Sequence, residues 1–320
     1  MSKRAIRLHE FDPFIPQGGH LALKDQREVM ERPFFSLAKR KRLKPIEYQS
    51  PDGEVSIHVS GNPAFGIATI WDADILIWAT SYLNKLRQAG ENDLPRTLRT
   101  TSYDLLKAIR RDTGGKGYKE LQGALQRLEA TTIQTSIRGS KRNRLSQFGW
   151  LDSWVMESDA ATGAPRGLSL TLSNWVYEGV LQDRGLLTLH PDYFALSGGL
   201  ERAIYRIARK HAGDQAGGWT CRIGVLHDKT GSESPLKQFS YLLKRIISTN
   251  ALPDYDLSWT STADGSTAVH FIRRDAAERA EVRTALAKLE ADSLRRRRED
   301  QRAAEIDNMF SREQKTRSGD

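Results

Sequence analysis

The 320-residue sequence has a single cysteine, Cys221, which excludes an intrachain disulfide and a thiolate zinc cluster. Long apolar runs are also missing, since the longest covers only residues 75–79 and is too short to cross a membrane. No apolar segment follows the N-terminal basic residues Lys3 and Arg4, so a secretory signal is not expected. These absences predict a soluble, cytoplasmic protein with no membrane partner.

Motifs for catalysis are absent as well. None of the seven histidines stands at metal-ligand spacing from another, so a nicking enzyme with a histidine-bound metal beside a tyrosine nucleophile is disfavoured. The segment Gly114-Gly115-Lys116 lacks the Ser or Thr that a phosphate-binding loop needs after its lysine, because Gly117 stands there. We therefore expect no enzymatic activity, no cofactor and no metal site.

Basic residues are in excess. The chain has 49 Lys and Arg against 40 Asp and Glu, a net charge of +9. Residues 84–150 carry 14 basic and 6 acidic groups and so account for nearly all of this charge. A local surplus of this size favours a polyanionic partner such as nucleic acid.

Hydrophobic periodicity and turn residues predict an ordered series of helices and strands. The expected helices cover residues 71–89, 102–111, 118–130, 174–181, 201–212, 220–229 and 236–249. The expected strands cover residues 55–59, 131–137, 148–156, 168–172, 255–262 and 267–273. Twice, two helices separated by a turn precede a hairpin.

This order indicates an internal repeat. A shift of 118 residues aligns the helix at 118–130 with the helix at 236–249, and it sets Ser102 on Thr220 as expected helix N-caps. We interpret each copy as a helix-turn-helix followed by a β-wing. In the first copy, the basic segment 138–147 is the expected turn of the wing.

The predicted fold is α+β, with two tandem winged-helix domains and a C-terminal helix. In chain order, the expected parts are a mobile N-terminal arm (1–30), the first winged-helix domain (31–160), the second winged-helix domain (161–275), the C-terminal helix (276–310) and a disordered tail (311–320).

The helix at 236–249 is the main candidate for contact with double-stranded DNA. Leu236, Phe239, Leu243 and Ile246 form an inward face. A helix in the major groove also needs an outward face of hydrogen-bond donors for bases and phosphates. The candidates on that face are Lys237, Gln238, Ser240, Tyr241, Lys244, Arg245 and Ser248. The alternative is the solvated face of an ordinary amphipathic helix, which the position behind a turn and before a hairpin disfavours.

The first copy offers a second set of DNA-binding candidates. Its helix supplies Lys116, Lys119 and Gln122, and its expected wing supplies Arg138, Lys141, Arg142 and Arg144. A basic wing can follow phosphates or enter a minor groove, and the alternative is a mobile charged loop. The basic run at 39–42 leaves the same choice open between phosphate contact and solvation.

Seven tryptophans raise the question of base stacking. Trp78 recurs at helical spacing with Ile75 and Leu86, which favours core packing. We expect Trp175 and Trp259 to pack in the core as well.

Three segments carry a resemblance to a known family. The first is Glu31-Arg32-Pro33-Phe34-Phe35-Ser36-Leu37 with the basic run that follows it. The second is Gly61-Asn62-Pro63-Ala64-Phe65-Gly66, which leads into Trp71-Asp72-Ala73-Asp74, and the third is Leu252-Pro253-Asp254-Tyr255. In combination they resemble plasmid replication initiator protein A over about residues 28–274.

The resemblance implies a protein that binds repeated double-stranded DNA sites, or iterons, at a plasmid origin and opens an AT-rich element. It implies two winged-helix domains, with the second as the main reader of sequence. It also implies a host helicase, a host initiator and a sliding clamp as partners, and a homodimer that represses its own gene. The alternative function is a DNA-binding transcriptional repressor with no role in replication.

Overall fold

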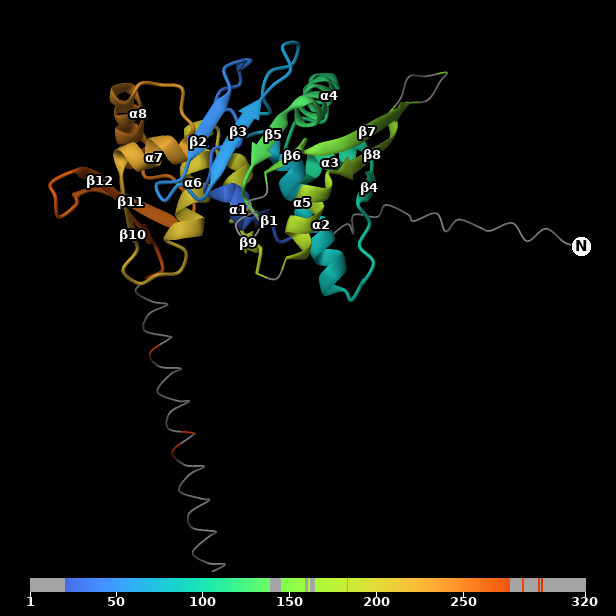
Figure 1. Ribbon diagram of the computed structural model, residues 1–320. Helices are drawn as coiled ribbons and strands as arrows, with labels where there is room; N and C mark the ends of the chain where they lie inside the picture. The colour runs from blue at the N-terminus through green and yellow to red at the C-terminus, as the bar shows by residue number, and fades with distance from the viewer. Residues whose placement is uncertain are drawn as a thin grey trace, which may run out of the picture.

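The computed structural model describes residues 21–138, 145–158, 161, 165–182 and 184–276, with the isolated positions 284, 293 and 295. Figure 1 shows the helices and four small sheets of this part of the chain. The helices are α1 (Arg27–Met30), α2 (Ala73–Gln88), α3 (Ser102–Ala108), α4 (Gly115–Ala130), α5 (Asn174–Leu181), α6 (Gly199–His211), α7 (Ile223–Thr230) and α8 (Leu236–Thr249), with the 3-10 helix η1 at Pro191–Ala195. The strands are β1 (Lys24–Gln26), β2 (Ile46–Gln49), β3 (Ser56–Ser60), β4 (Thr97–Thr100), β5 (Thr132–Thr135), β6 (Ser146–Phe148), β7 (Leu151–Ser158), β8 (Pro165–Leu172), β9 (Leu186–Thr188), β10 (Trp219–Arg222), β11 (Tyr255–Ser261) and β12 (Thr267–Arg273). The expected mixture of α and β structure is confirmed.

The first unit consists of α2, β4, α3, α4, β7 and β8. Its strands form an antiparallel sheet in the order β4-β8-β7. The helices pack on this sheet through leucines such as Leu105, Leu125 and Leu128, which are fully buried. Because β8 pairs with both other strands, residues 165–172 belong to this unit. The predicted boundary at 160/161 instead assigns them to the second unit.

The second unit repeats this arrangement with α6, β10, α7, α8, β11 and β12. Its sheet has the order β10-β12-β11, so the first strand again lies beside the last. Leu226, Phe239, Leu243 and Phe271 are fully buried and form its core. The two units therefore share one order of helices and one order of strands.

The repeat has a longer spacing than the sequence suggests. Helices α3 and α7 begin 121 residues apart, and so do α4 and α8, against the predicted 118. The pairing of Ser102 with Thr220 as N-caps is wrong. Thr220 lies in β10 opposite His270, while the cap of α3 is Thr101, whose hydroxyl accepts the backbone N–H of Asp104 at 3.0 Å.

A further sheet has the order β2-β3-β5-β6, with β2 and β3 from the segment before α2 and with β5 and β6 from the segment between α4 and β7. The predicted strand at 148–156 is in fact two strands, β6 and β7, because the chain turns at Trp150 to bury this side chain. Trp150 is 1% exposed and stacks on Phe35 with ring centroids 4.7 Å apart. The basic segment 138–147 thus lies between β5 and β6, while the hairpin equivalent to β11–β12 is β7–β8.

The segment before the first unit is part of the fold. Strand β1 pairs antiparallel with β9, and α1 contacts α6. Val29 and Met30 are buried, which explains why residues 24–30 are ordered structure, whereas the sequence predicts a mobile arm. Residues 1–20 of that arm, most of the predicted C-terminal helix beyond Ala276 and the predicted tail lie outside the described residues.

None of the helices in the described ranges is both long and apolar enough to cross a membrane.

Candidate nucleic-acid interface

Helix α8 has one buried face and one exposed face, as predicted. Phe239, Leu243 and Ile246 point into the second unit, whereas Leu236, expected on the inward face, is 48% exposed at the first position. The exposed face carries six of the seven candidates: Lys237, Gln238, Tyr241, Lys244, Arg245 and Ser248. The structure therefore agrees with the prediction that these side chains share one face of a helix at residues 236–249.

The long side chains of this face have no partners among the described residues. Lys237, Gln238, Lys244 and Arg245 make no side-chain hydrogen bond or ion pair there, and Tyr241 is 57% exposed. The two serines differ. The half-buried Ser240 donates its hydroxyl to the carbonyl of Leu236, and Ser248 donates to that of Arg245, so both already bond to their own helix.

A hollow of about 500 Å³ lies between α8 and the β11–β12 hairpin. Lys244 and Ser240 line it from α8, and Trp259 lines it from β11. The sequence predicts core packing for Trp259, but this side chain is half-buried. Its place beside the candidate helix is not predicted. Its position at this rim could be found only from the pairing of β11 with β12.

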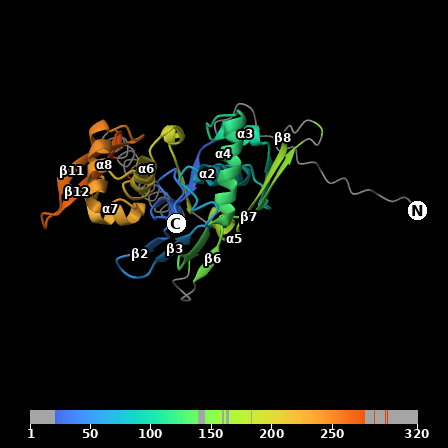
Figure 2. The same ribbon diagram turned by 90° about the horizontal axis from the view of Figure 1, so that it is seen from above.

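Helix α4 carries the second set of candidates. Lys116, Lys119 and Gln122 are exposed, and within the described part of the chain only Lys116 has a side-chain partner, Glu120, with 3.8 Å between Nζ and Oε1. Lys116 and Lys119 also line a hollow of about 630 Å³ that reaches across to η1 and α6. Seen from above in Figure 2, α4 and α8 lie on the same face of the molecule, at a distance from each other. The structure thus brings both candidate helices to one surface.

The basic segment between β5 and β6 divides into two parts. Arg138 is 15% exposed; its Nε donates to Glu28 at 2.7 Å, its Nη1 donates to the carbonyl of Trp175 at 2.6 Å, and it stacks on the Trp175 ring. Because its guanidinium is bound by Glu28 and Trp175, Arg138 is not part of the interface. Lys141, Arg142 and Arg144 lie outside the described residues.

Two side chains of the basic run at 39–42 bind the turn between α7 and α8. Arg42 is 6% exposed and donates to the carbonyl of Gly231, at the turn between α7 and α8, at 2.8 Å. Arg40 forms an ion pair with Glu233 of the same turn, with 3.4 Å between Nη2 and Oε2. The sequence leaves phosphate contact and solvation as the two alternatives for this run. The structure adds a third role, because Arg40 and Arg42 attach the first half of the chain to the second unit.

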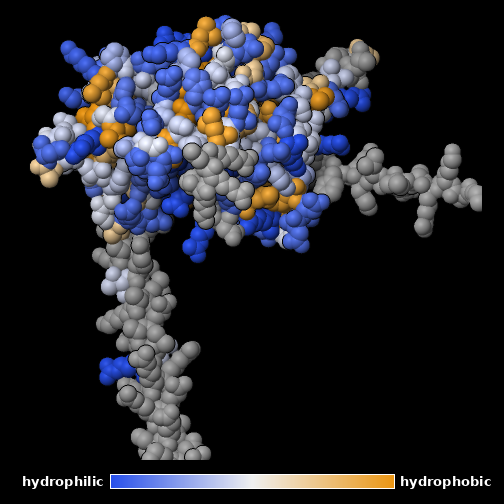
Figure 3. Space-filling view, in the orientation of Figure 1, coloured by the Kyte–Doolittle hydropathy of each residue, from blue (hydrophilic) through white to orange (hydrophobic). Residues whose placement is uncertain are grey.

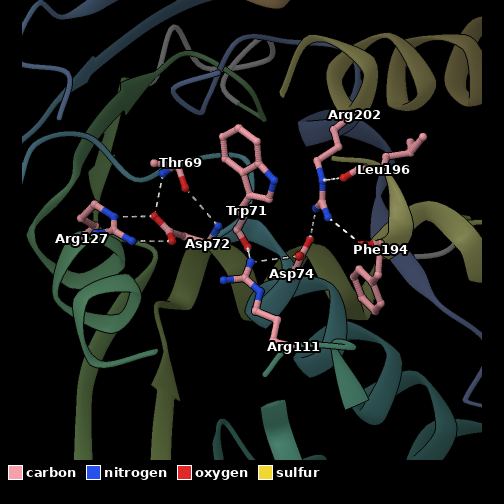
Figure 4. A network of polar contacts seen from close by, with 9 residues as sticks. All are labelled: Thr69, Trp71, Asp72, Asp74, Arg111, Arg127, Phe194, Leu196 and Arg202. Atoms are coloured by element: carbon pink, nitrogen blue, oxygen red, sulfur yellow. Dashed lines mark hydrogen bonds and ion pairs between the residues drawn. The ribbon is translucent and has the colours of Figure 1, made fainter. Parts of the chain in front are cut away.

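Two aspartates of the segment Trp71–Asp74 organise a buried polar network (Figure 4). Asp72 is 1% exposed and accepts two hydrogen bonds from Arg127 of α4, at 2.7 Å and 2.8 Å. It also accepts the backbone N–H of Thr69 at 2.7 Å. The bidentate pair fixes α4 to the start of α2, which positions the candidate face of α4.

Asp74 joins the two units. One of its oxygens accepts Nη1 of Arg202 in α6 at 2.7 Å, and the other accepts Nη2 of Arg111, which follows α3, at 3.0 Å. Arg202 is itself held by the carbonyls of Leu196 and Phe194, at 2.7 Å and 3.0 Å. Because both charges of the Asp74–Arg202 pair are buried, α6 has one position relative to α2 (Figure 4).

Two further carboxylates of the N-terminal segment bind α6. Asp25 accepts Nε of Arg206 at 2.8 Å, and both side chains are buried. Glu31 accepts Nε2 of His211 at 3.1 Å and lies near three cations, Arg32, Lys210 and Lys229. Burial acts to raise the pKa of Glu31, but the hydrogen bond from His211 and the three charges lower it to about 2.

No group of His, Cys, Asp or Glu side chains suited to holding a metal ion is present in the described part of the chain. Cys221 is buried in β10, and burial raises the pKa of its thiol to about 11. A thiol of this kind is inert at neutral pH. The exposed faces of α8 and α4 offer hydrogen-bond donors and positive charge.

Comparisons with known proteins cover most of the chain. Residues 24–257 match the family model described as Replication initiator protein A. A protein of Wigglesworthia glossinidia brevipalpis, named "Putative replication protein", is 35% identical over 238 residues, which are 73% of this chain and 84% of that protein. A crystal structure of domains 2 and 3 of RctB has a TM-score of 0.55 at 15% identity, covering 75% of this chain and 94% of that one, which is a similarity of fold alone.

Proposed function

Because the chain belongs to the replication initiator protein A family, we propose that it is a replication initiator that binds double-stranded DNA through α8 and α4. The observation that carries this proposal is the common face of the two helices, with unpartnered Lys, Arg and Gln side chains on α8. Such donors match the acceptors of base edges and phosphates in the major groove.

Each unit is interpreted as a winged helix. The order helix, strand, helix, helix, strand, strand, with the first strand beside the last, supports this interpretation. In it α4 and α8 are the recognition helices, and β7–β8 and β11–β12 are the wings. The wing of the first unit is then β7–β8, and the basic segment 138–147 belongs to the sheet β2-β3-β5-β6.

The two units have different tasks in this proposal. Helix α8 has more donors suited to bases and reads most of the sequence, whereas α4, in the segment that carries the charge surplus, contributes phosphate contacts. Two recognition helices on one rigid chain allow a single copy to read an asymmetric repeat, which suits direct repeats (iterons) at an origin. Lys141, Arg142 and Arg144 remain candidates for additional phosphate contacts.

The finer steps follow the family resemblance. The protein opens an AT-rich element next to the repeats, recruits the host helicase, the host initiator and the sliding clamp, and represses its own gene as a homodimer. It acts in the cytoplasm, without a cofactor and without catalysing a reaction itself.

Substitution of Lys244 or Arg245 by Ala tests the proposal. Each change should weaken binding to the repeats beside the gene by about 1–3 kcal/mol, or roughly 5–150-fold, if the side chain contacts a base. Footprinting and equilibrium titration at fixed salt measure the effect. Lys85→Ala, near the end of α2, is the matched control and should bind like the unchanged protein. Equal affinities for all four proteins would contradict a role for α8.

A further inference from the structure

The segment Gly61–Gly66 of the family resemblance forms a tight loop after β3. The carbonyl of Asn62 accepts the backbone N–H groups of Phe65 at 3.1 Å and Gly66 at 2.7 Å. Its side-chain oxygen accepts the N–H of Ala64 at 2.8 Å. Gly66 has a φ of +79°, and a Cβ on Gly61 would lie 2.4 Å from the carbonyl carbon of Gly66. Both glycines are therefore required, and the loop has one shape.

A second loop, which precedes β2, packs against the first. Lys41 donates from Nζ to the carbonyl of Pro63 at 3.0 Å, and the N–H of Ile67 donates to the carbonyl of Arg42 at 3.0 Å. Arg42 is in turn bound to the turn between α7 and α8. We refer to residues 39–44 and 61–66 together as the central loops. They are fixed to each other and to the second unit.

The central loops expose two large apolar side chains to solvent. Leu43 is 54% exposed and Phe65 is 37% exposed. Figure 3 shows a hydrophobic patch at the top edge of the molecule, where Figure 1 places these loops. Exposed cations lie around this pair in the sequence of the same loops: Lys39, Arg40, Lys41 and Lys44. An apolar tip with a basic surround is complementary to a nucleic-acid groove lined by phosphates.

The position of the loops agrees with this chemistry. In Figure 1 they rise from the face that carries the candidate helices, between α8 on the left and α4 on the right. When two helices enter successive major grooves on one side of B-form DNA, the minor groove faces the protein between them. The central loops lie at that place.

We propose that the central loops insert Phe65 and Leu43 into the minor groove between the sites of α4 and α8, and thereby kink and unstack the duplex. This rests on the proposed function. Apolar wedges of this kind separate a base step and bend DNA by about 20–90°. The rigid loop Gly61–Gly66 holds Phe65 in its exposed position. The cations of the central loops offset the repulsion between the phosphates that the bend brings closer together. This insertion costs least at pyrimidine–purine base steps such as TA, because these are the most easily unstacked.

The test separates binding from deformation. A duplex with the protein's repeat receives 2-aminopurine at each central position in turn, and a donor–acceptor pair at its ends reports the bend by energy transfer. Both are measured at saturating protein, so that only bound DNA is compared. The variants are Phe65→Ala, Leu43→Ala and Phe65→Trp, and the matched control is Leu181→Ala, an exposed leucine on α5. Circular dichroism confirms that each variant is folded.

The proposal predicts that the unchanged protein raises the 2-aminopurine fluorescence several-fold at one or two adjacent positions. Phe65→Ala should lose at least half of this increase and of the bend while keeping the footprint of α8. Leu43→Ala should lose less, and Phe65→Trp and Leu181→Ala should behave like the unchanged protein.

Two outcomes overturn the inference and leave the proposed function intact. In one, Lys244→Ala lowers affinity but Phe65→Ala bends and unstacks DNA like the unchanged protein. In the other, bending is unchanged and Phe65→Ala instead loses binding of a second copy or of a partner protein, so the patch is a protein contact. Failure of the unchanged protein to bind the repeats would refute the proposed function itself.

Discussion

At the level of single residues, several basic side chains that resemble a DNA-binding surface in the sequence hold the protein together. Arg42 binds Gly231, and Arg138 binds Glu28. Sequence patterns could not reveal these roles, because the partners lie 189 and 110 residues away. The candidates on α8 were predictable for the opposite reason. Their neighbours are in the same helix, and helical spacing alone separates them from the buried face.

Glu31 should make stability depend on pH. Its pKa is lowered from 4.5 to about 2 in the folded state, so its contribution is fully present above about pH 4.5 and is lost as the pH falls toward 2. Glu31→Gln should lower the free energy of unfolding at pH 7 by about 2 kcal/mol, because a buried charged acceptor is removed from partly buried donors. The difference in the free energy of unfolding between the unchanged protein and Glu31→Gln should become smaller below pH 4.5. Urea unfolding at a series of pH values measures it.

The control for this prediction is Glu47→Gln. Glu47 is 79% exposed, and its ion-pair partner among the described residues is His58, with 3.8 Å between the two side chains. This variant should unfold like the unchanged protein at every pH. A Glu31→Gln protein whose deficit stays constant from pH 7 to pH 3 would contradict the assignment of the effect to the ionised carboxylate.

At the level of elements, local sequence signals locate most helices, whereas pairing between distant strands is not predictable from them. The bounds of α5 and α8 agree with the prediction, because each has a clear apolar face and a turn signal at its end. The sequence predicts that a helix begins at residue 220, but residues 219–222 form β10, since they pair with β12. The pairing of β5 with β3 escapes prediction for the same reason, because β3 is far away in the sequence.

Helix α4 should contribute to the salt dependence of DNA binding. Replacing Lys116 and Lys119 by Gln removes two charges from its exposed face. The slope of log affinity against log salt should fall by about one unit for each phosphate that the variant no longer neutralises, with little change in the preference among DNA sequences. Titrations between low and physiological salt measure the slope.

Lys85→Gln is the control here, since it removes one lysine charge from α2. It should leave the slope unchanged. If the double variant of α4 also keeps the full slope, the phosphates are bound elsewhere and α4 has another role.

At the level of the whole molecule, buried ion pairs join the two units. The central one is Asp74 with Arg202, in which both side chains are buried. Arg202→Met should lower the free energy of unfolding by about 3–5 kcal/mol, because it leaves a buried carboxylate with one cation fewer. The same change should cost less when Asp74 is already Asn. Urea unfolding of the four proteins of this double-mutant cycle gives the coupling, which should exceed about 1 kcal/mol.

Arg110 and Asp192 provide the matched pair. They also connect α3's end with η1 across the boundary, but their side chains are 47% and 60% exposed. Their coupling should be no more than about 0.5 kcal/mol. Equal coupling energies for the two pairs would mean that burial does not strengthen the contact between the units.

The contacts of the N-terminal segment also determine the order in which the chain can fold during synthesis. Lys24 of β1 bonds to Thr188, 164 residues later, and Asp25 bonds to Arg206, 181 residues later. Until α6 has left the ribosome, each of the carboxylates Asp25, Glu31 and Asp74 lacks at least one of the cations that accompany it in the finished protein. Burying them earlier would cost the full desolvation of a charge. We therefore expect the first unit to complete its core late, together with the second, so that the proposed interface on α4 and α8 forms near the end of translation.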